Sequence, residues 1–291
     1  MAETSASTAY GVMSQIALEQ YQPHRIVDDA YAAQMLPGYA QVLLRLMSPR
    51  PLHQAMSSLF ESIAPGVLTG ILCRKRYVDD QVLAALKAGV QTVVILGAGL
   101  DTLAYRLPEL ASARVYEVDF PQTITYKSER LRAIFGSIPA HVTLTPIDFE
   151  TQKLETVLTA QGYSFEPPTL FIWEGVTQYL SEAAVRATLQ SLTQAAPASR
   201  LVFTYVRQSF IDGSDKLGLD SFYKRMRSGS DPLWKFGLDP AAVADFIHPY
   251  GWTVVEQAGA AEWRERYVLP AGRSEPITEL ERIVSAEKAA S

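Results

Sequence analysis

Two glycines lie where a short apolar run gives way to a helix-like segment. The run covers residues 93–96, and Gly97 and Gly99 follow it. Glycines here would allow a tight turn and a close approach of the backbone to a ligand, and the next helix would offer free N–H groups to an anion. A dinucleotide-binding fingerprint has a third glycine where this chain has Thr102. The loop therefore indicates a site for a nucleotide-like cofactor, and an ordinary strand–turn–helix connection is the alternative.

Carboxylates end the next apolar run. Glu117 and Asp119 lie about 20 residues after the glycine loop. In a nucleotide-binding α/β fold, a carboxylate at this strand end accepts hydrogen bonds from both ribose hydroxyls. Either residue could serve, and the alternative for the other is a helix N-cap ahead of Pro121.

Two further acids follow later predicted strands. Asp148 comes directly after residues 142–147, and Glu174 comes directly after residues 170–173. The carboxyl ends of the strands in an open parallel sheet face one ligand crevice, so we expect these acids to converge with Glu117 and Asp119. A solvated loop carboxylate is the alternative for each of them.

The spacing of apolar residues divides the chain into two parts. Helical spacing predicts helices over residues 10–20, 29–36, 39–47, 53–63 and 77–86. Later, short apolar runs alternate with helix-length segments, at residues 92–96, 114–118, 142–147, 170–173, 201–206, 252–256 and 266–269. This alternation is typical of βαβ units and a mostly parallel sheet. The last two runs are too close for a crossover helix, so we expect them to form an antiparallel edge hairpin.

We therefore predict an α/β protein with a seven-stranded, mostly parallel, Rossmann-like sheet. A helical N-terminal cap would span residues 1–88, and a cofactor-binding catalytic domain would span residues 89–291. The interval between the fifth and sixth runs is too long for one crossover, so residues around 208–240 are expected to form an inserted lid. A solvated helix is expected over residues 275–291.

Composition disfavours several classes of protein. The chain of 291 residues is 48% hydrophobic and 20% charged, which is typical of a folded globular protein and not of a disordered one. Its net charge of −5 is unfavourable for binding nucleic acid. No apolar run approaches the ~18 residues that cross a bilayer. The lone Cys73 and an acidic N-terminus without signal-peptide features favour a cytoplasmic location, and the four histidines lack paired metal-ligand spacing.

The glycine loop and the acidic strand end resemble those of the leucine carboxyl methyltransferase-like branch of class I S-adenosylmethionine-dependent methyltransferases, which includes relatives of bacterial polyketide O-methyltransferases. The likeness rests on Thr8-Ala9 with Ala17-Leu18-Glu19, Arg74 with Tyr77-Val78-Asp79-Asp80, residues 96–102 with Tyr105-Arg106-Leu107, residues 116–121 with Lys127, and residues 174–180. Ile16 departs from the pattern, because bacterial relatives usually carry arginine there, and any charge contact of that arginine is missing.

The resemblance implies that the chain binds S-adenosylmethionine and releases S-adenosylhomocysteine. It implies that Arg74 holds the methionine carboxylate, that Asp119 with Glu117 meets the ribose, and that Glu174 lies near the cofactor's amino group. It also places Gly97, Ala98, Gly99 and Asp101 in the cofactor loop and Asp148 and Phe149 beside the adenine. The planar fork of an arginine suits a carboxylate, and a surface charge is the alternative for Arg74.

The predicted activity is O-methylation of a carboxylate or hydroxyl on a small-molecule acceptor. A carboxylate is ionised at neutral pH, whereas a phenol with a pKa near 10 needs a base, and the sequence nominates none. Tyr179 and Arg207 follow the fourth and fifth predicted strands and are expected to orient the acceptor. Ordinary packing is the alternative for Tyr179, and a solvated strand end is the alternative for Arg207.

Other functions are weighed against this one. A nicotinamide-dependent oxidoreductase is disfavoured by the absent third glycine. A methyltransferase of protein C-terminal carboxylates would need an open groove, and a binding protein would keep the pocket without turnover. The expected partners are a small-molecule acceptor and no nucleic acid or membrane, with the chain a monomer or a homodimer.

Overall fold

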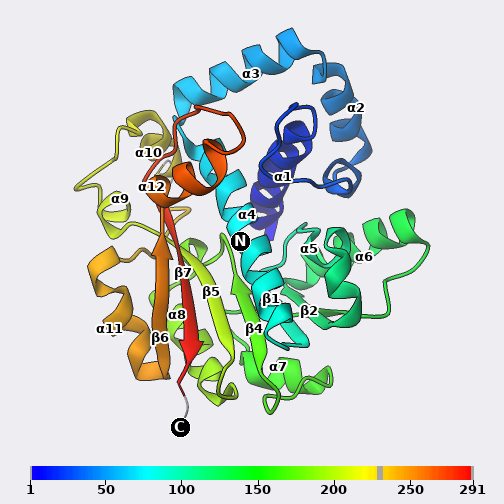
Figure 1. The fold of residues 1–291 in the computed structure, drawn as a ribbon, viewed down its shortest axis with the longest axis vertical. Coiled ribbons are helices and arrows are strands. Elements are labelled where there is room, and N and C mark those ends of the chain that lie inside the picture. Colours follow the sequence, from blue (N-terminus) through cyan, green and yellow to red (C-terminus); the bar gives the residue numbers. More distant parts are fainter. Residues whose placement is uncertain (1, 228–231, 290–291) are drawn as a thin grey trace.

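A seven-stranded sheet forms the centre of the computed structural model, which describes residues 2–227 and 232–289 (Figure 1). Its strands are β1 (Thr92–Leu96), β2 (Arg114–Asp119), β3 (Val142–Pro146), β4 (Thr169–Trp173), β5 (Arg200–Val206), β6 (Trp252–Ala258) and β7 (Glu281–Lys288). The order is β3-β2-β1-β4-β5-β7-β6. β1 to β5 pair in parallel, and β7 is antiparallel to β5 and β6. The strand order therefore switches between β1 and β4: β2 and β3 lie on one side of β1, and β4 and β5 lie on the other. Open α/β sheets bind their ligands at such a switch point.

Helices cover both faces of the sheet and extend beyond one end of it. Before the sheet come α1 (Ala2–Glu19), α2 (Gly38–Met47), α3 (Arg50–Ile63) and α4 (Val67–Lys87). Between the parallel strands lie α5 (Leu103–Arg106), α6 (Pro121–Phe135), α7 (Leu154–Ala160) and α8 (Glu182–Ser191). α9 (Gln208–Asp212), α10 (Asp220–Met226) and α11 (Val243–Ile247) follow β5, and α12 (Ala260–Trp263) follows β6. α2 and α3 lie at the top of Figure 1, opposite the C-terminus.

The two faces of the sheet carry separate apolar layers. Val93 and Ile95 of β1 belong to the layer that includes side chains of α1, α4 and α6. Val94 and Leu96 belong to the layer of α7, α8 and α11 on the other face. Successive strand residues point to opposite faces, and all of β1 is buried. This explains why β1 is a continuous apolar run in the sequence, as the prediction of a parallel strand requires.

The structure contradicts two predictions for the C-terminal part. Residues 266–269 do not form a strand, because a π-helical segment, Arg264–Val268, continues α12. The predicted helix over residues 275–291 is also wrong, because β7 occupies Glu281–Lys288 and lies between β5 and β6. Ile283 and Val284 of β7 are fully buried in the two opposite layers. The apolar centre of this strand is short and is flanked by charged residues, so the sequence pattern did not identify it as a strand.

The N-terminal helices begin earlier than the sequence predicts. α4 begins at Val67 and not at residue 77, so Arg74 lies inside this helix and not ahead of it. The predicted helix over residues 29–36 is only a short 3-10 helix, Ala32–Met35. The interval between β5 and β6 contains α9, α10 and α11. The division into a cap and a catalytic domain stays a prediction.

No single helix among the described residues is both long enough and apolar enough to span a bilayer. One bent pair, Met56–Ile63 with Val67–Lys87, meets the test by length and composition, and its arms meet at 97°. The cytoplasmic location stays a prediction.

Candidate cofactor and acceptor site

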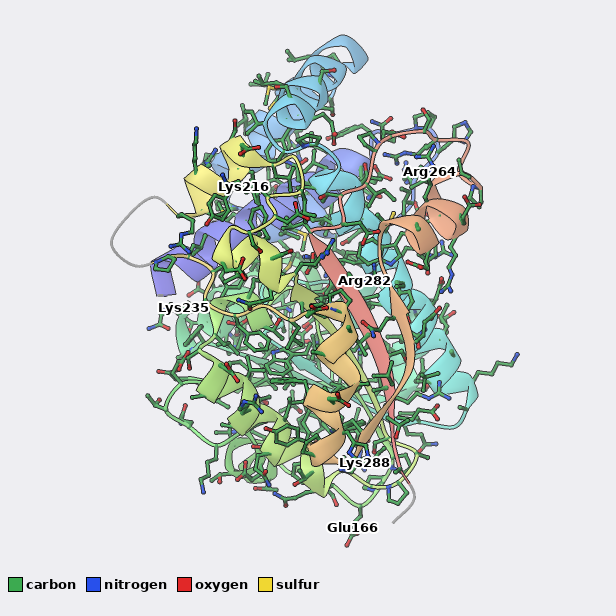
Figure 2. All side chains as sticks on the ribbon, turned by 90° about the vertical axis from the view of Figure 1, so that its left-hand side faces the viewer. Glu166, Lys216, Lys235, Arg264, Arg282 and Lys288 are labelled. Atoms are coloured by element: carbon green, nitrogen blue, oxygen red, sulfur yellow. The ribbon has the colours of Figure 1, made fainter. Side chains whose placement is uncertain are left out.

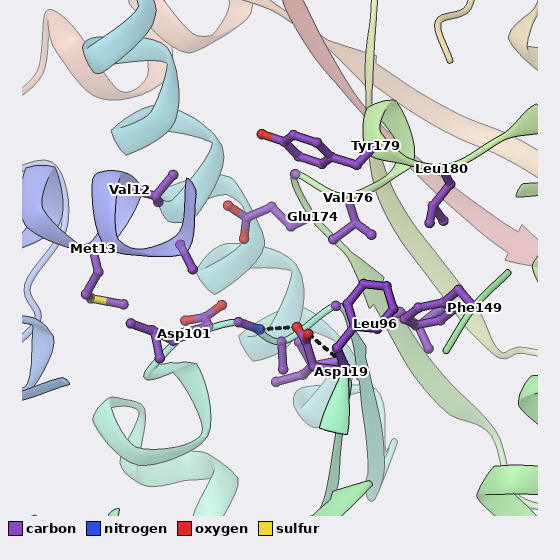
Figure 3. A pocket seen from close by; sticks show the side chains of 18 of the residues that line it. Val12, Met13, Leu96, Asp101, Asp119, Phe149, Glu174, Val176, Tyr179 and Leu180 are labelled. Carbon is purple, nitrogen blue, oxygen red and sulfur yellow. Dashed lines mark hydrogen bonds between the residues drawn. The ribbon is translucent and has the colours of Figure 1, made fainter. Parts of the chain in front are cut away.

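A cavity of about 700 Å³ opens at the carboxyl ends of β1, β2 and β4 (Figure 3). The loop after β1 forms its floor, and residues of α1 and α4 line it as well. The segment after β4 and parts of the insertion after β5 complete its lining. Cavities of roughly 300–1,000 Å³ are typical of sites for small ligands and cofactors.

The glycine loop is held in a turn that side chains would obstruct. Gly97 has φ +70° and Gly99 has φ +47°, the left-handed region that favours glycine. A Cβ on Gly97 would lie 2.3 Å from Val176 Cγ2. The Gly99 amide donates to Asp119 Oδ2 at 2.6 Å. The loop is thus fixed between the end of β2 and the segment after β4.

Asp119 lines the cavity beside this loop. Its two carboxylate oxygens each accept a backbone N–H, one from Gly99 and one from Phe120, both at 2.6 Å (Figure 3). Burial raises the pKa of Asp119 above its ordinary value, against the lowering effect of these hydrogen bonds. The side chain is rigidly oriented at the strand end where a ribose would bind.

Glu117 is fully buried and does not line the cavity. Lys127 Nζ lies 2.8 Å from its Oε2, and the Tyr105 hydroxyl donates to the same oxygen at 2.8 Å. Lys127 Nζ also donates to the Ala98 carbonyl at 3.4 Å. The sequence predicted that either acid could bind the ribose. In the structure, Asp119 lines the cavity, whereas Glu117 forms a buried ion pair beneath the loop.

The Glu117–Lys127 pair gives a stability prediction. We expect Lys127→Met to lower the free energy of unfolding by about 3–5 kcal/mol, because it leaves a buried carboxylate unpaired. The double variant Glu117→Gln/Lys127→Met should lose clearly less, because no buried charge is left over. Urea unfolding followed by circular dichroism measures both. Equal losses in the single and double variants would show that the pairing is not the cause.

Two cations and three acids form one ion-pair network along another wall. Arg74 Nε lies 2.8 Å from Glu174 Oε1, and Arg74 Nη1 lies 2.5 Å from Glu281 Oε2. Lys75 Nζ bridges Glu174 Oε2 at 3.0 Å and Asp101 Oδ2 at 2.8 Å. Burial by itself would raise the pKa of Asp101, but the nearby cations, first Lys75, hold it below its ordinary value. The network thus places three carboxylates against two cations.

Glycine is also required next to this network. Gly175 has φ +69°, and a Cβ there would lie 2.9 Å from Arg74 Nη2. Its amide donates to the Thr204 hydroxyl at 2.7 Å. The turn after β4 therefore leaves room for the Arg74 guanidinium at the cavity wall.

Thr102 occupies the position of the third glycine in the dinucleotide fingerprint, and in the structure it binds Asp29 of the N-terminal segment. Its side chain is fully buried, and its hydroxyl donates to Asp29 Oδ2 at 2.5 Å. Asp29 Oδ1 in turn accepts the backbone N–H groups of Tyr31 and Ala32. A threonine here ties the N-terminal segment to the cofactor loop.

Residues 9–193 match the family model described as leucine carboxyl methyltransferase. The chain belongs to this family. A relative in Mycobacteroides abscessus, named "Putative S-adenosyl-L-methionine-dependent methyltransferase", is 29% identical over 268 residues, which cover 88% of this chain and 86% of the relative. A relative of the same name in Mycobacterium avium is 34% identical over 208 residues, covering 71% of this chain and 67% of the relative.

Solved structures agree on the fold. A methyltransferase structure from Thermobifida fusca covers 82% of this chain and 89% of its own, with a TM-score of 0.60 and 18% identity. A protein from Bordetella parapertussis covers 98% of this chain and 97% of its own, with a TM-score of 0.52 and 16% identity. Together, family and relatives identify the chain as an S-adenosylmethionine-dependent methyltransferase of class I fold, as the sequence predicts.

The cavity of the methyltransferase fits this cofactor. The methionine tail carries an ammonium and a carboxylate, and the sulfonium adds a positive charge. The Arg74 guanidinium would face the carboxylate, and Glu174 and Asp101 would place negative charge near the ammonium and the sulfonium. Asp119 offers a carboxylate at the ribose position, beside a glycine loop that lets the backbone approach.

Most of the predicted site residues meet at this cavity. Those that line it are Arg74, Gly97, Ala98, Gly99, Asp101, Asp119, Phe149, Glu174 and Tyr179. Glu117, Asp148 and Arg207 are not among the lining residues. Asp148 Oδ1 accepts the Glu150 N–H in a turn, and the Arg207 N–H donates to the Leu280 carbonyl. The roles assigned to individual residues stay predictions.

Sequence reasoning missed several lining residues. Lys75 belongs to a run of three basic residues, 74–76, that gives no sign of which side chains turn inward. In the insertion, the cavity is lined by Arg225, Met226, Leu233 and Lys235, none of which the sequence singled out. The aromatic rings of Phe210, Phe222 and Trp234 instead pack against one another.

Proposed function

We propose that the methyltransferase acts on a carboxylate or hydroxyl oxygen of a small-molecule acceptor. Support comes from the part of the cavity lining formed by the insertion and the segment after β4. Arg225 and Lys235 bring two cationic side chains there, and Met226 and Leu233 bring apolar ones. This combination suits an amphipathic acceptor that carries a negative charge.

The insertion is tied to the segment that carries Tyr179. The Lys235 N–H donates to the Gln178 carbonyl at 2.7 Å, and the rings of Tyr179 and Trp234 make an edge contact at 6.3 Å. The Tyr179 side chain extends over the cavity (Figure 3). A phenol held in this way is able to position an acceptor by a hydrogen bond or by its ring. Tyr179 is therefore proposed as an acceptor-orienting residue.

The chemistry requires little from the protein beyond alignment and exclusion of water. S-adenosylmethionine, when bound, supplies a methyl group whose carbon bonds to the acceptor oxygen while the carbon–sulfur bond electrons return to sulfur. A carboxylate acceptor is already ionised and has no proton to lose. His24, His141 and His248 are not among the lining residues. The lack of a histidine base along the described lining favours a carboxylate.

Transfer of an isotope-labelled methyl group tests the proposal. The purified enzyme would be incubated with labelled S-adenosylmethionine and a panel of small carboxylic acids and phenols. We expect label in a small-molecule product. Alkali should release methanol from a methyl ester and leave a methyl ether intact, which separates the two acceptor types. Label found only on protein, or bound to nitrogen or carbon, would contradict the proposal.

The two cations give a prediction about specificity. The Arg225→Ala/Lys235→Ala variant is expected to raise KM for an anionic acceptor about 10-fold, because each exposed charge contributes roughly 0.5–1 kcal/mol. KM for S-adenosylmethionine should stay unchanged. Lys224→Ala is the matched control, since Lys224 is exposed on α10 but does not line the cavity. An equal rise in KM for an uncharged acceptor would show that the charges do not select it.

A further inference from the structure

The apolar sides of α2 and α3 are exposed to water. On α2, Tyr39, Val42, Leu43 and Leu46 follow the spacing of one helical face. On α3, the same holds for Leu52, Met56, Leu59, Phe60 and Ile63. Tyr39 is 76% exposed and Leu46 is 65% exposed. We call these nine described side chains the α2–α3 stripe.

Helical stripes of this kind normally pack against another element of the same chain. On α2, however, Leu44 is the one described residue that is buried. The two helices stand at the end of the molecule away from the C-terminus (Figure 1), and Figure 2 shows them from the side, at the top of the view. Their sequence pattern therefore favours a contact that the described part of the chain does not make.

The size of the stripe decides what kind of contact it is. Its nine side chains, each about half exposed, present roughly 900 Å² of surface. The largest apolar patch on a typical monomer is about 300–600 Å². A specific protein–protein interface of standard size buries about 800 Å² on each partner. The stripe is thus larger than a monomer needs and large enough for a stable dimer.

The polar residues of this segment argue against a membrane surface. Helices that lie on membranes carry lysine and arginine on their polar side. Residues 38–63 contain no lysine and only Arg45 and Arg50 as basic residues besides His53, with Glu61 as an acid. Most of their other polar residues are serine and glutamine. So few basic residues suit a contact between proteins better than binding to lipid headgroups.

We propose that the α2–α3 stripe is the dimer interface of this methyltransferase, with a second copy of the chain as its partner. A two-fold contact would pair the stripe with itself, so that one surface satisfies the apolar residues of both copies. Helical stripes with this spacing pack into one another as ridges into grooves. The interface lies apart from the cavity, because no described residue of α2 or α3 lines it. Dimerisation and cofactor binding are therefore separable in an experiment.

Sedimentation equilibrium over a range of concentrations tests the dimer. The wild type is expected to reach twice its 32.1 kDa mass, with a dissociation constant at or below about 1 µM. The Leu46→Glu/Leu59→Glu variant should dimerise at least about 100-fold more weakly, because each copy would bury two charges in the contact. Both proteins should show the same thermal stabilisation by S-adenosylhomocysteine, which reports intact folding of each copy.

Val255→Glu is the matched control, since Val255 is 61% exposed on the edge strand β6 and far from the stripe in sequence. It should dimerise as the wild type does. The proposal is overturned if the wild type stays at 32.1 kDa up to about 100 µM. It is also overturned if Val255→Glu dissociates the dimer as strongly as the stripe variant, or if a monomeric wild type co-sediments with phosphatidylcholine vesicles.

Discussion

The Arg74→Ala variant is expected to bind S-adenosylhomocysteine at least about 100-fold more weakly than the wild type. Arg74 is 7% exposed and pairs with both Glu174 and Glu281. Its removal takes away a charge-assisted partner of the ligand carboxylate and leaves two carboxylates facing that group. Truncating one member of a buried, hydrogen-bonded charge pair in a binding site costs about 2–5 kcal/mol of affinity, and 1.4 kcal/mol corresponds to a factor of ten. Isothermal titration calorimetry measures the affinity directly.

Two further variants isolate the cause of this loss. Arg74→Lys keeps the charge and removes the planar fork, so its affinity should lie between that of Arg74→Ala and the wild type. Arg76→Ala is the matched control, because Arg76 lies on the same helix, is half exposed and pairs with Asp80. It should bind as the wild type does. An unchanged affinity of a folded Arg74→Ala protein would remove Arg74 from the cofactor site.

The Gly97→Ala variant is expected to lose cofactor binding by a factor of more than about 100. A Cβ at this position would collide with Val176 at 2.3 Å, and the φ of +70° adds strain for any L-residue. The loop must shift to relieve the collision, and with it the backbone that approaches the ligand. Calorimetry with S-adenosylhomocysteine and thermal unfolding measure affinity and stability together.

Gly162→Ala separates the two causes. Gly162 has φ +82°, but a Cβ there would meet nothing within 4 Å. This variant should lose only about 1 kcal/mol of stability and no affinity. The Gly97→Ala/Val176→Ala variant should recover part of the affinity, because the collision partner is shortened. If Gly97→Ala binds as tightly as Gly162→Ala, the close packing of the loop is not what positions the cofactor.

Local patterns in the sequence predicted the centre of the sheet correctly. β1, β2, β4 and β5 begin and end within one residue of their predicted positions. Parallel strands buried on both faces appear as unbroken apolar runs, so their pattern is visible without any neighbour. β7 escaped prediction because its short apolar centre is flanked by charges and becomes recognisable only between β5 and β6.

In the candidate site, too, some features were predicted from the sequence and others became visible only in the structure. Glycine, acid and arginine positions could be read from the chain, because turns and strand ends leave local signals. The distinction between Glu117 and Asp119 could not, since two residues apart on one strand they share a face of the sheet. It was made by Lys127 and Tyr105, which hold Glu117 beneath the loop.

By itself, the sequence determined a glycine loop and carboxylates at successive strand ends, and the resemblance of these motifs indicated a class I methyltransferase. Steric limits on the backbone and the burial of strands act over a few residues, so a linear pattern contains them. The tertiary structure decided which charges meet. Arg74 and Glu174 are 100 residues apart in the chain and 2.8 Å apart in space. The chain folds around the sheet to bring them together, and no local pattern encodes that distance.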